Sequence, residues 1–262
     1  MVRSGRRTRC FAAALAGALL AAGCSSSTPL LTVEGGLFAP QLSGKVGLAS
    51  QAVTDVDTID LNSQLDLGSR KIVPYLRGEL NGASIDVALN GFRTSESGRG
   101  TVTANFGKIT AGSTVDTSLD LGLAHGRLAF DLFDTKWLTL GAGLGAEYLD
   151  LKLDAREPVF ALNESIAVRQ ALPLIVARGA VRPPALPLDL ELEVGGISGT
   201  YQAVHGTLLD AEALVRWKVT GPLALFGGYR FIHFMIRGHS GSESFDGNVD
   251  LSGLLLGLSL RF

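Results

Sequence analysis

Apolar and polar side chains alternate along most of this chain, and this two-residue period constrains the fold more than any other feature. Successive side chains of a β-strand point to opposite faces, so the period predicts strands rather than helices. In the final segment, small or polar residues such as Ser259 and Arg261 occupy one face. The other face is apolar and is formed by Leu254, Leu256, Leu258, Leu260 and Phe262. A face of this length suits a tilted strand that crosses a bilayer.

The same period predicts about ten strands, and the connections between them alternate in length. Short turns at one end and long loops at the other are typical of an outer-membrane barrel. The predicted fold class is therefore an all-β, antiparallel, transmembrane up-and-down β-barrel. An eight-strand barrel stays open if the first or the sixth segment lies outside the wall. The segments are 42–52, 71–80, 83–95, 117–133, 138–148, 170–182, 186–195, 207–219, 222–237 and 254–262.

Turn-forming residues punctuate these segments. Tight turns are expected at 81–82, 134–136, 183–184 and 220–222, and a short connection at 201–205. Longer connections are expected at 53–70, 96–116, 155–169 and 238–246. Within 117–133 the apolar phase changes between Leu123 and Leu128, which a β-bulge or a misplaced strand boundary would explain.

Alternation alone fits two barrels, because a soluble barrel turns its apolar face inward and a membrane barrel turns it outward. Small residues on the polar faces suit a crowded lumen. Aromatic residues near strand ends, Trp137, Trp217, Tyr148 and Tyr229, suit the membrane interfaces. We therefore predict a membrane barrel. Its lumen-facing charges are expected to be Arg77, Glu79, Asp86, Glu147, Asp189, Glu191, Glu193, Asp210, Glu212, Arg216 and Lys218.

These lumen charges have mixed signs, and mixed signs at close range tend to pair and fill a lumen. A hairpin across 201–205 would place Asp189 opposite Arg216, and Glu193 near Glu212. The first pair should attract. The second pair would need a base from another strand, for which Arg77 and Arg178 are candidates.

The composition agrees with a membrane location and excludes one class of partner. Mean hydropathy is +0.28, yet beyond the N-terminus no apolar run is long enough for a membrane helix. The net charge of −2 leaves no basic surplus to neutralise phosphates, so a nucleic-acid partner is not expected.

The N-terminus has the features of an export signal. Basic residues precede a short apolar stretch at 11–22. The sequence Leu20-Ala21-Ala22-Gly23-Cys24 resembles the lipobox of bacterial lipoproteins, which implies acylation of Cys24. Cleavage at an ordinary signal-peptide site is the alternative. The predicted organisation is a signal peptide at 1–23, a lipid-anchored tether at 24–40 and the barrel at 41–262.

Three stretches resemble a family of small outer-membrane β-barrel proteins of unknown function. They are 111–121, 144–151, and 227–230 together with the closing Arg261-Phe262. The terminal Phe262 also resembles the C-terminal signal that outer-membrane proteins present to the barrel-assembly machinery. The resemblance implies a barrel and no particular activity.

Catalytic and metal sites are weakly indicated. The stretch from Tyr229 to His233 faintly resembles the His-bearing strand of lipid A deacylases, but Met235 and Ile236 occupy the places of that family's Ser-Asn pair. His125 and His205 have no partner at metal-ligand spacing. The acidic loop with Asp55, Asp57 and Asp60 lacks the glycine and bidentate glutamate of a calcium loop. We expect no enzyme, cofactor or metal.

Three functions remain open from the sequence. The first is a structural or interaction barrel in the outer membrane of a Gram-negative cell envelope. The second is a narrow diffusion channel for small solutes, and the third is a soluble periplasmic lipoprotein that binds a ligand. The expected partners of the first are outer-membrane lipids and, during biogenesis, the barrel-assembly machinery.

Overall fold

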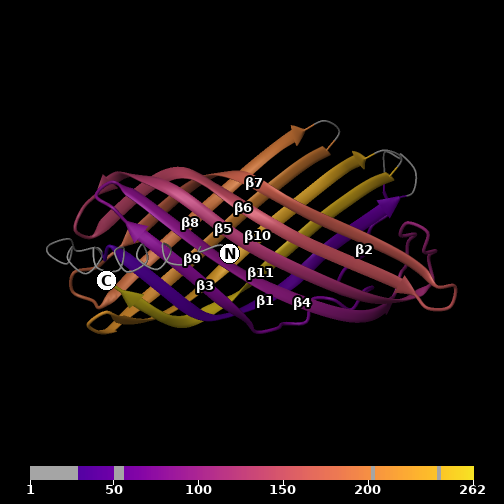
Figure 1. Ribbon diagram of the computed structural model, residues 1–262, viewed down its shortest axis with the longest axis horizontal. Helices are drawn as coiled ribbons and strands as arrows, with labels where there is room; N and C mark the ends of the chain where they lie inside the picture. The colour runs from indigo at the N-terminus through magenta and orange to yellow at the C-terminus, as the bar shows by residue number, and fades with distance from the viewer. Residues whose placement is uncertain (1–28, 50–55, 202–203, 241–242) are drawn as a thin grey trace, which may run out of the picture.

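The computed structural model describes residues 29–49, 56–201, 204–240 and 243–262. Eleven strands form one antiparallel sheet in the order β11-β10-β9-β8-β7-β6-β5-β4-β3-β1-β2, and β11 also pairs with β1. The sheet therefore closes into a barrel (Figure 1). The strands are β1 (Leu31–Ala49), β2 (Ile59–Asp60), β3 (Val73–Asn81), β4 (Ile85–Thr101), β5 (Thr114–Asp134), β6 (Leu138–Glu157), β7 (Leu162–Val181), β8 (Leu188–Tyr201), β9 (Val204–Thr220), β10 (Leu223–Ser240) and β11 (Glu243–Arg261).

Ten of these strands run through the wall, since β2 has two residues and lies beside β1. The predicted up-and-down barrel of about ten strands is confirmed, and the eight-strand alternative is wrong because 42–52 and 170–182 contribute to β1 and β7. Among the described residues, no helix is long and apolar enough to cross a membrane. The predicted signal peptide at 1–23 and the acylation site Cys24 lie outside the described residues.

The two ends of the barrel differ. At the turn end, Leu31 N–H donates to the Phe262 carbonyl (3.1 Å), and the predicted tight turns join β3 to β4, β5 to β6, β7 to β8 and β9 to β10. At the opposite loop end, the expected long connections between β6 and β7 and between β10 and β11 are much shorter, because the strands extend further. Only residues 158–161 separate β6 from β7, where the sequence predicts a loop over 155–169.

The wall also begins earlier than the sequence predicts. β1 starts at Leu31, so residues 31–40 belong to the barrel and not to the tether. Val33 and Leu37 point outward while Glu34 points inward, which is the alternation of a wall strand. The glycines and the proline of this stretch conceal that alternation in the sequence.

A segment without regular structure bridges the wall beside β1. β3 pairs with β1 only over Leu31–Phe38 of β1, and beyond that point residues 61–72 contact both β1 and β4. Leu65 of this segment lies inside the barrel, where its carbonyl accepts from the Thr117 hydroxyl (2.9 Å). The Leu61 N–H donates to the Gly44 carbonyl (2.9 Å) of β1, and the Lys71 ammonium donates to the Ser95 carbonyl (2.5 Å) of β4. The expected loop at 53–70 is thus partly a component of the wall.

The outer surface carries a belt of exposed apolar side chains. Leu256 is 68% exposed and Leu192 53%, and their alternating neighbours on β11 and β8 behave in the same way. In a soluble barrel these residues would pack inside. Their outward direction agrees with the membrane barrel that the alternation predicts.

β5 corrects the predicted change of phase. Its inward and outward positions alternate without interruption from Val115 to Phe130, and the register shift lies further on, between Asp131 and Phe133. Leu123 and its neighbours point inward, whereas Leu128 and Phe130 point outward. The alternation of the strand is therefore continuous in this part. Its apolar residues point inward in the first part of the strand and outward in the later part.

We predict that Leu256→Arg, in the middle of the belt, lowers the free energy of unfolding by about 2–4 kcal/mol, because it places a charge in hydrocarbon. Urea titration of protein folded into lipid vesicles measures this. The control is Ser97→Arg, at an exposed outward position of β4 beyond the belt, where a change within about 0.5 kcal/mol is expected. Equal losses in the two variants would contradict a lipid-facing belt.

Candidate functional site: the interior of the barrel

The half of the lumen near the turn end contains a network of buried charges. Its members come from nine of the wall strands, and each points inward because of the alternation just described. The five arginines of this charged network are Arg77, Arg127, Arg178, Arg216 and Arg230. Its acidic residues are Glu34, Glu79, Asp86, Glu147, Asp189, Glu191, Glu193, Asp210 and Glu212.

Arg77 links opposite walls of the barrel. It lies on β3, and β8 is the strand farthest from β3 around the closed sheet. Its Nη2 lies 2.7 Å from Oε1 of Glu191 on β8, and its Nη1 bonds Glu212 on β9. Side chains from one wall therefore meet those of the other wall within the lumen.

Glu191 receives several of these cations. Its second oxygen, Oε2, accepts from Arg216 Nη1 at 2.5 Å, and Arg127 Nη2 approaches Oε1 at 3.3 Å. Arg216 also bonds Glu34 of β1 at 2.5 Å. Glu191 and Glu34 are thus each paired with a guanidinium, which offsets the cost of removing these carboxylates from water.

A second group of contacts centres on His125 of β5. Its Nδ1 lies 2.7 Å from Glu147 Oε2, and its Nε2 lies 2.8 Å from Glu193 Oε1. Only the Nδ1 contact has the geometry of a hydrogen bond. An ionised carboxylate only accepts, so Nδ1 donates to Glu147. His125 is thus held among acidic side chains of the network.

The same group has the spacing of a metal site but not its chemistry. His125, Glu147 and Asp210 offer ligand atoms that lie within 4.8 Å of one another. Arg230 already bonds Asp210 at 2.7 Å and Asn90 at 2.7 Å. A metal ion at Asp210 would have to displace this guanidinium, so the contacts that the structure shows are those of an ion-pair network.

The predicted cross-strand pairs have the expected register but other ion-pair partners. Asp189 is the register partner of Arg216, and Glu193 that of Glu212. Asp189 instead pairs with Lys218 (2.9 Å), whose side chain is 45% exposed at the turn end, and with Arg261 (2.5 Å). Arg77 does reach Glu212, as proposed, whereas Arg178 bonds Asp86 at 2.5 Å.

The remaining residues of the sequence list all lie inside. The structure places Glu79, Asp86, Glu147, Glu191 and Asp210 in the buried network. Sequence reasoning missed three members that alternate with the same period. Glu34 lies in the predicted tether. Arg127 and Arg230 lie in predicted strands, but the predicted inward positions of those strands did not include them.

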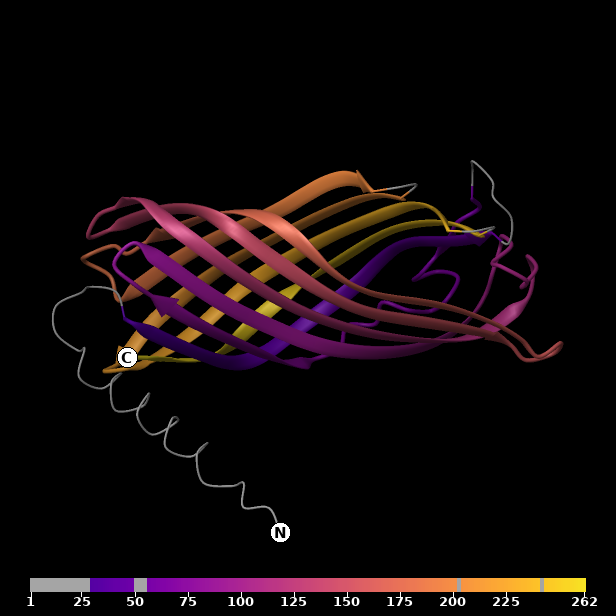
Figure 2. The ribbon, with the colours of Figure 1, turned by 45° about the horizontal axis from the view of Figure 1, so that its top comes forward.

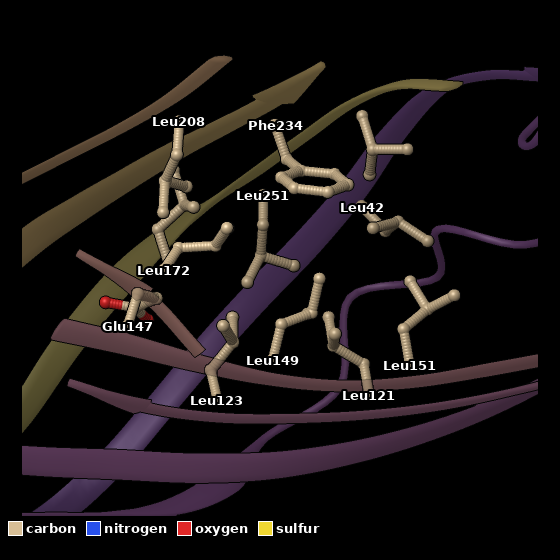
Figure 3. A pocket seen from close by; sticks show the side chains of 12 residues that line it. Leu42, Leu121, Leu123, Glu147, Leu149, Leu151, Leu172, Leu208, Phe234 and Leu251 are labelled. Atoms are coloured by element: carbon tan, nitrogen blue, oxygen red, sulfur yellow. The ribbon is translucent and has the colours of Figure 1, made fainter. Parts of the chain in front are cut away.

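Toward the loop end the interior becomes apolar. A cavity of about 40 Å³ lies there, and Glu147 is the one acidic residue in its lining, at the boundary with the charged network (Figure 3). The change of side that β5 shows is the sequence signal for this apolar half. The other lining residues are Leu42, Leu121, Leu123, Leu149, Leu151, Leu172, Leu208, Ile232, Phe234, Val249 and Leu251.

The other candidate residues make local contacts. His233 points outward and lies 2.7 Å from Asp250, its register partner on β11. His205 Nδ1 lies 3.0 Å from the Thr200 hydroxyl. Asp60 accepts the Ser63 N–H at 2.8 Å, a bond that holds its pKa below the usual range, so this carboxylate caps a turn. Asp55 lies outside the described residues.

Solved structures with a similar fold are outer-membrane barrels. The outer membrane protease OmpT from Escherichia coli matches with a TM-score of 0.57 and 12% identity, over 88% of this chain and 96% of that chain. AlkL, an outer membrane protein, gives 0.39 and 13% over 92% and 94%. The translocator domain of the autotransporter NalP from Neisseria meningitidis gives 0.34 and 10% over 97% and 97%.

No protein-family model matches this chain, and no curated protein matches it either. The likeness to OmpT therefore concerns the fold alone. This chain has the fold of an outer-membrane β-barrel. The resemblance to one family of small barrels of unknown function stays a prediction.

We predict that Arg77→Met lowers the free energy of unfolding by about 3–5 kcal/mol, because it removes the arginine that pairs with the buried Glu212 and one of the three that approach Glu191. The control is Arg99→Met. Arg99 pairs with Asp116 on the exposed surface, so its loss should cost at most about 1 kcal/mol. Urea unfolding followed by tryptophan fluorescence measures both. Equal effects would show that the network contributes no more than a surface pair.

Proposed function

We propose that this protein is an outer-membrane barrel of a Gram-negative cell with a closed lumen, and that its role is structural or interactive rather than catalytic. One observation carries the proposal: Arg77 contacts Glu191 and Glu212 on the far side of the lumen. A lumen occupied by such contacts offers water and ions no continuous path. The outward apolar belt supports a location in the membrane.

The two alternatives receive less support. A narrow diffusion channel needs an axial path, which the charged network obstructs. A soluble ligand-binding barrel needs a polar outer surface, whereas Leu144, Leu256 and Ile175 are each about 70% exposed. The fold itself does not decide whether the protein is an enzyme, because OmpT is a protease and one fold hosts many functions.

The loop end supports an interaction role. β6 and β7 continue past the belt, and their outward residues there are polar, including Lys152 and Arg169. At the tip of this hairpin Val159 is 78% exposed and Phe160 77%. Exposed apolar side chains held on a rigid hairpin suit contact with another envelope component.

We predict that the purified wild-type protein produces no stepwise ion conductance in planar lipid bilayers, because the charged network blocks the axis. Insertion is verified in the same preparation by the heat-modifiable gel migration of a folded barrel. An open porin in the same membrane is the positive control. Discrete conductance steps that depend on this protein would overturn the closed-lumen proposal in favour of the channel.

We also propose that Cys24 is acylated and anchors the N-terminus on the periplasmic side. Cys24→Ser should abolish metabolic labelling by a fatty-acid analogue, while the heat-modifiable barrel still forms because the wall begins at Leu31. Cys10→Ser, inside the expected signal peptide, is the matched control and should leave labelling unchanged. Persistent labelling of the Cys24 variant would refute the lipobox interpretation.

A further inference from the structure

The apolar cavity is closed along the barrel axis on both sides. Toward the turn end lies the charged network, which begins at Glu147. Toward the loop end, residues 102–113 cross the mouth of the barrel. The Gly107 N–H donates to the Leu48 carbonyl of β1 (2.9 Å), and the Lys108 N–H donates to Glu164 of β7 (2.9 Å).

This crossing segment is well packed. β1 and β7 lie on opposite sides of the ring, so the segment spans the whole mouth. Phe106 and Ile109 pair with each other through two backbone hydrogen bonds, and both side chains are buried in the apolar half. A ligand for the cavity therefore needs a route other than the axis.

The backbone pairing of the wall is interrupted beside the cavity, which leaves a gap between β7 and β8. Within the described residues, β7 pairs with β8 only over Ile175–Val181 of β7, although β7 begins at Leu162. Beyond Ile175, β7 pairs with β6 alone and β8 with β9 alone. The β6–β7 and β8–β9 hairpins diverge toward the loop end in both views of the ribbon (Figures 1 and 2).

The sequence explains where the pairing stops. Pro173 of β7 lies two residues before the last paired residue and has no N–H to donate to a neighbouring strand. Gly196 is the register partner of Ile175, the last paired residue, and adds no side chain at this outward position of β8. The gap is thus encoded in the chain at the point where the two strands separate.

The gap between β7 and β8 lies at the edge of the apolar belt. On β6 the outward residues change from Tyr148 to Asp150, and on β7 from Ala171 to Arg169, which is the register partner of Asp150. Leu172, which lines the cavity, lies at this same level. The gap therefore faces the place where hydrocarbon meets the polar surface of the membrane.

The side chains along the gap are apolar and incompletely covered. Leu172, Ile197 and Phe234 point inward from β7, β8 and β10, and each is half-buried and packs against the core. Leu172 and Leu208 both line the cavity (Figure 3). A connected apolar surface that stays partly exposed marks a binding site for an apolar ligand.

We propose that the acyl chain of an outer-membrane lipid enters sideways between β7 and β8 and binds in this apolar half. The level of the gap selects the bilayer as the source, because a chain can pass from hydrocarbon into the cavity without crossing water. The cavity accepts the end of the chain, and the rest lies along the half-buried side chains of the gap.

The test uses the full-length protein in vesicles that contain a phospholipid with a photoactivatable group near the end of one acyl chain. After irradiation, mass spectrometry maps the modified residues. Labelling of Leu172, Leu208 or Phe234 is expected in addition to outward residues such as Leu256. Labelling confined to the outward belt would overturn the proposal, and no variant is needed for this result.

A matched pair of variants on β9 tests occupancy. Leu208→Trp fills the cavity from the inside and should reduce labelling of Leu172 and Phe234 at least fivefold. Leu209→Trp, the next residue, points outward and should leave that labelling within twofold of wild type. If Leu208→Trp lacks heat-modifiable migration, Leu172→Gln at the half-buried rim replaces it, with at least a threefold reduction expected. An unchanged inner label in the folded variant would contradict the proposed site.

The source of the chain is tested separately. A free photoactivatable fatty acid is added from the aqueous phase to vesicles without labelled phospholipid. Inner labelling by the phospholipid supports the lateral route. Inner labelling by the free acid alone would overturn the lipid as the occupant, while the closed lumen of the proposed function would still be judged by conductance.

Discussion

Hydrocarbon offers no hydrogen-bond partners to a peptide backbone, and the pairing of β1 with β11 is how this chain meets that constraint. Without this seam two strand edges would face lipid with their N–H and C=O groups unpaired. Closure also fixes the diameter. In a ring of ten wall strands, a guanidinium from one wall reaches a carboxylate on the opposite wall, as Arg77 and Glu191 do. The charged network therefore depends on closure of the barrel, because closure brings opposite walls within ion-pair distance.

The interior has two chemically different halves, and both are built by the same strands. β6 supplies Glu147 to the network and Leu149 to the apolar half, on successive inward positions. Outside, the order is reversed, since the apolar belt surrounds the charged half and polar residues surround the apolar half. Each of these strands therefore has one apolar face at every level. That face points toward lipid around the charged half and toward the core in the apolar half.

The sequence predicts well those features that depend on residues close together in the chain or on the two-residue period. Tight turns, the outward leucines and the register of Asp189 with Arg216 follow from turn chemistry and a period of two. Ion-pair partners did not follow, because they are decided by distances across the lumen rather than along a ladder. Arg216 thus bonds Glu34, a residue more than half the chain away. The start of β1 was missed since Gly35, Gly36 and Pro40 are typical of a loop.

The apolar half was missed for a different reason. From the sequence, a β-bulge or a misplaced strand boundary explains the change of phase in β5, and both explanations assume that one environment extends along each face of a strand. The structure shows an uninterrupted strand passing between two environments. The same change occurs in β6, between Leu144 and Leu149, and the agreement of two neighbouring strands distinguishes it from an irregularity in one.

The extension of β6 and β7 past the belt has a mechanical consequence. The stretch from Asp150 to Glu157 is paired with β7 along its whole length, so it stands as a stiff ribbon. With a rise of about 3.3 Å per residue and a tilt of about 40°, it lifts the hairpin tip roughly 20 Å above the belt. Val159 and Phe160 are therefore held at a constant height, beyond the layer of lipid headgroups. A binding partner at this tip would be held away from the bilayer surface, and a force on that partner would be transmitted directly to the wall of the barrel.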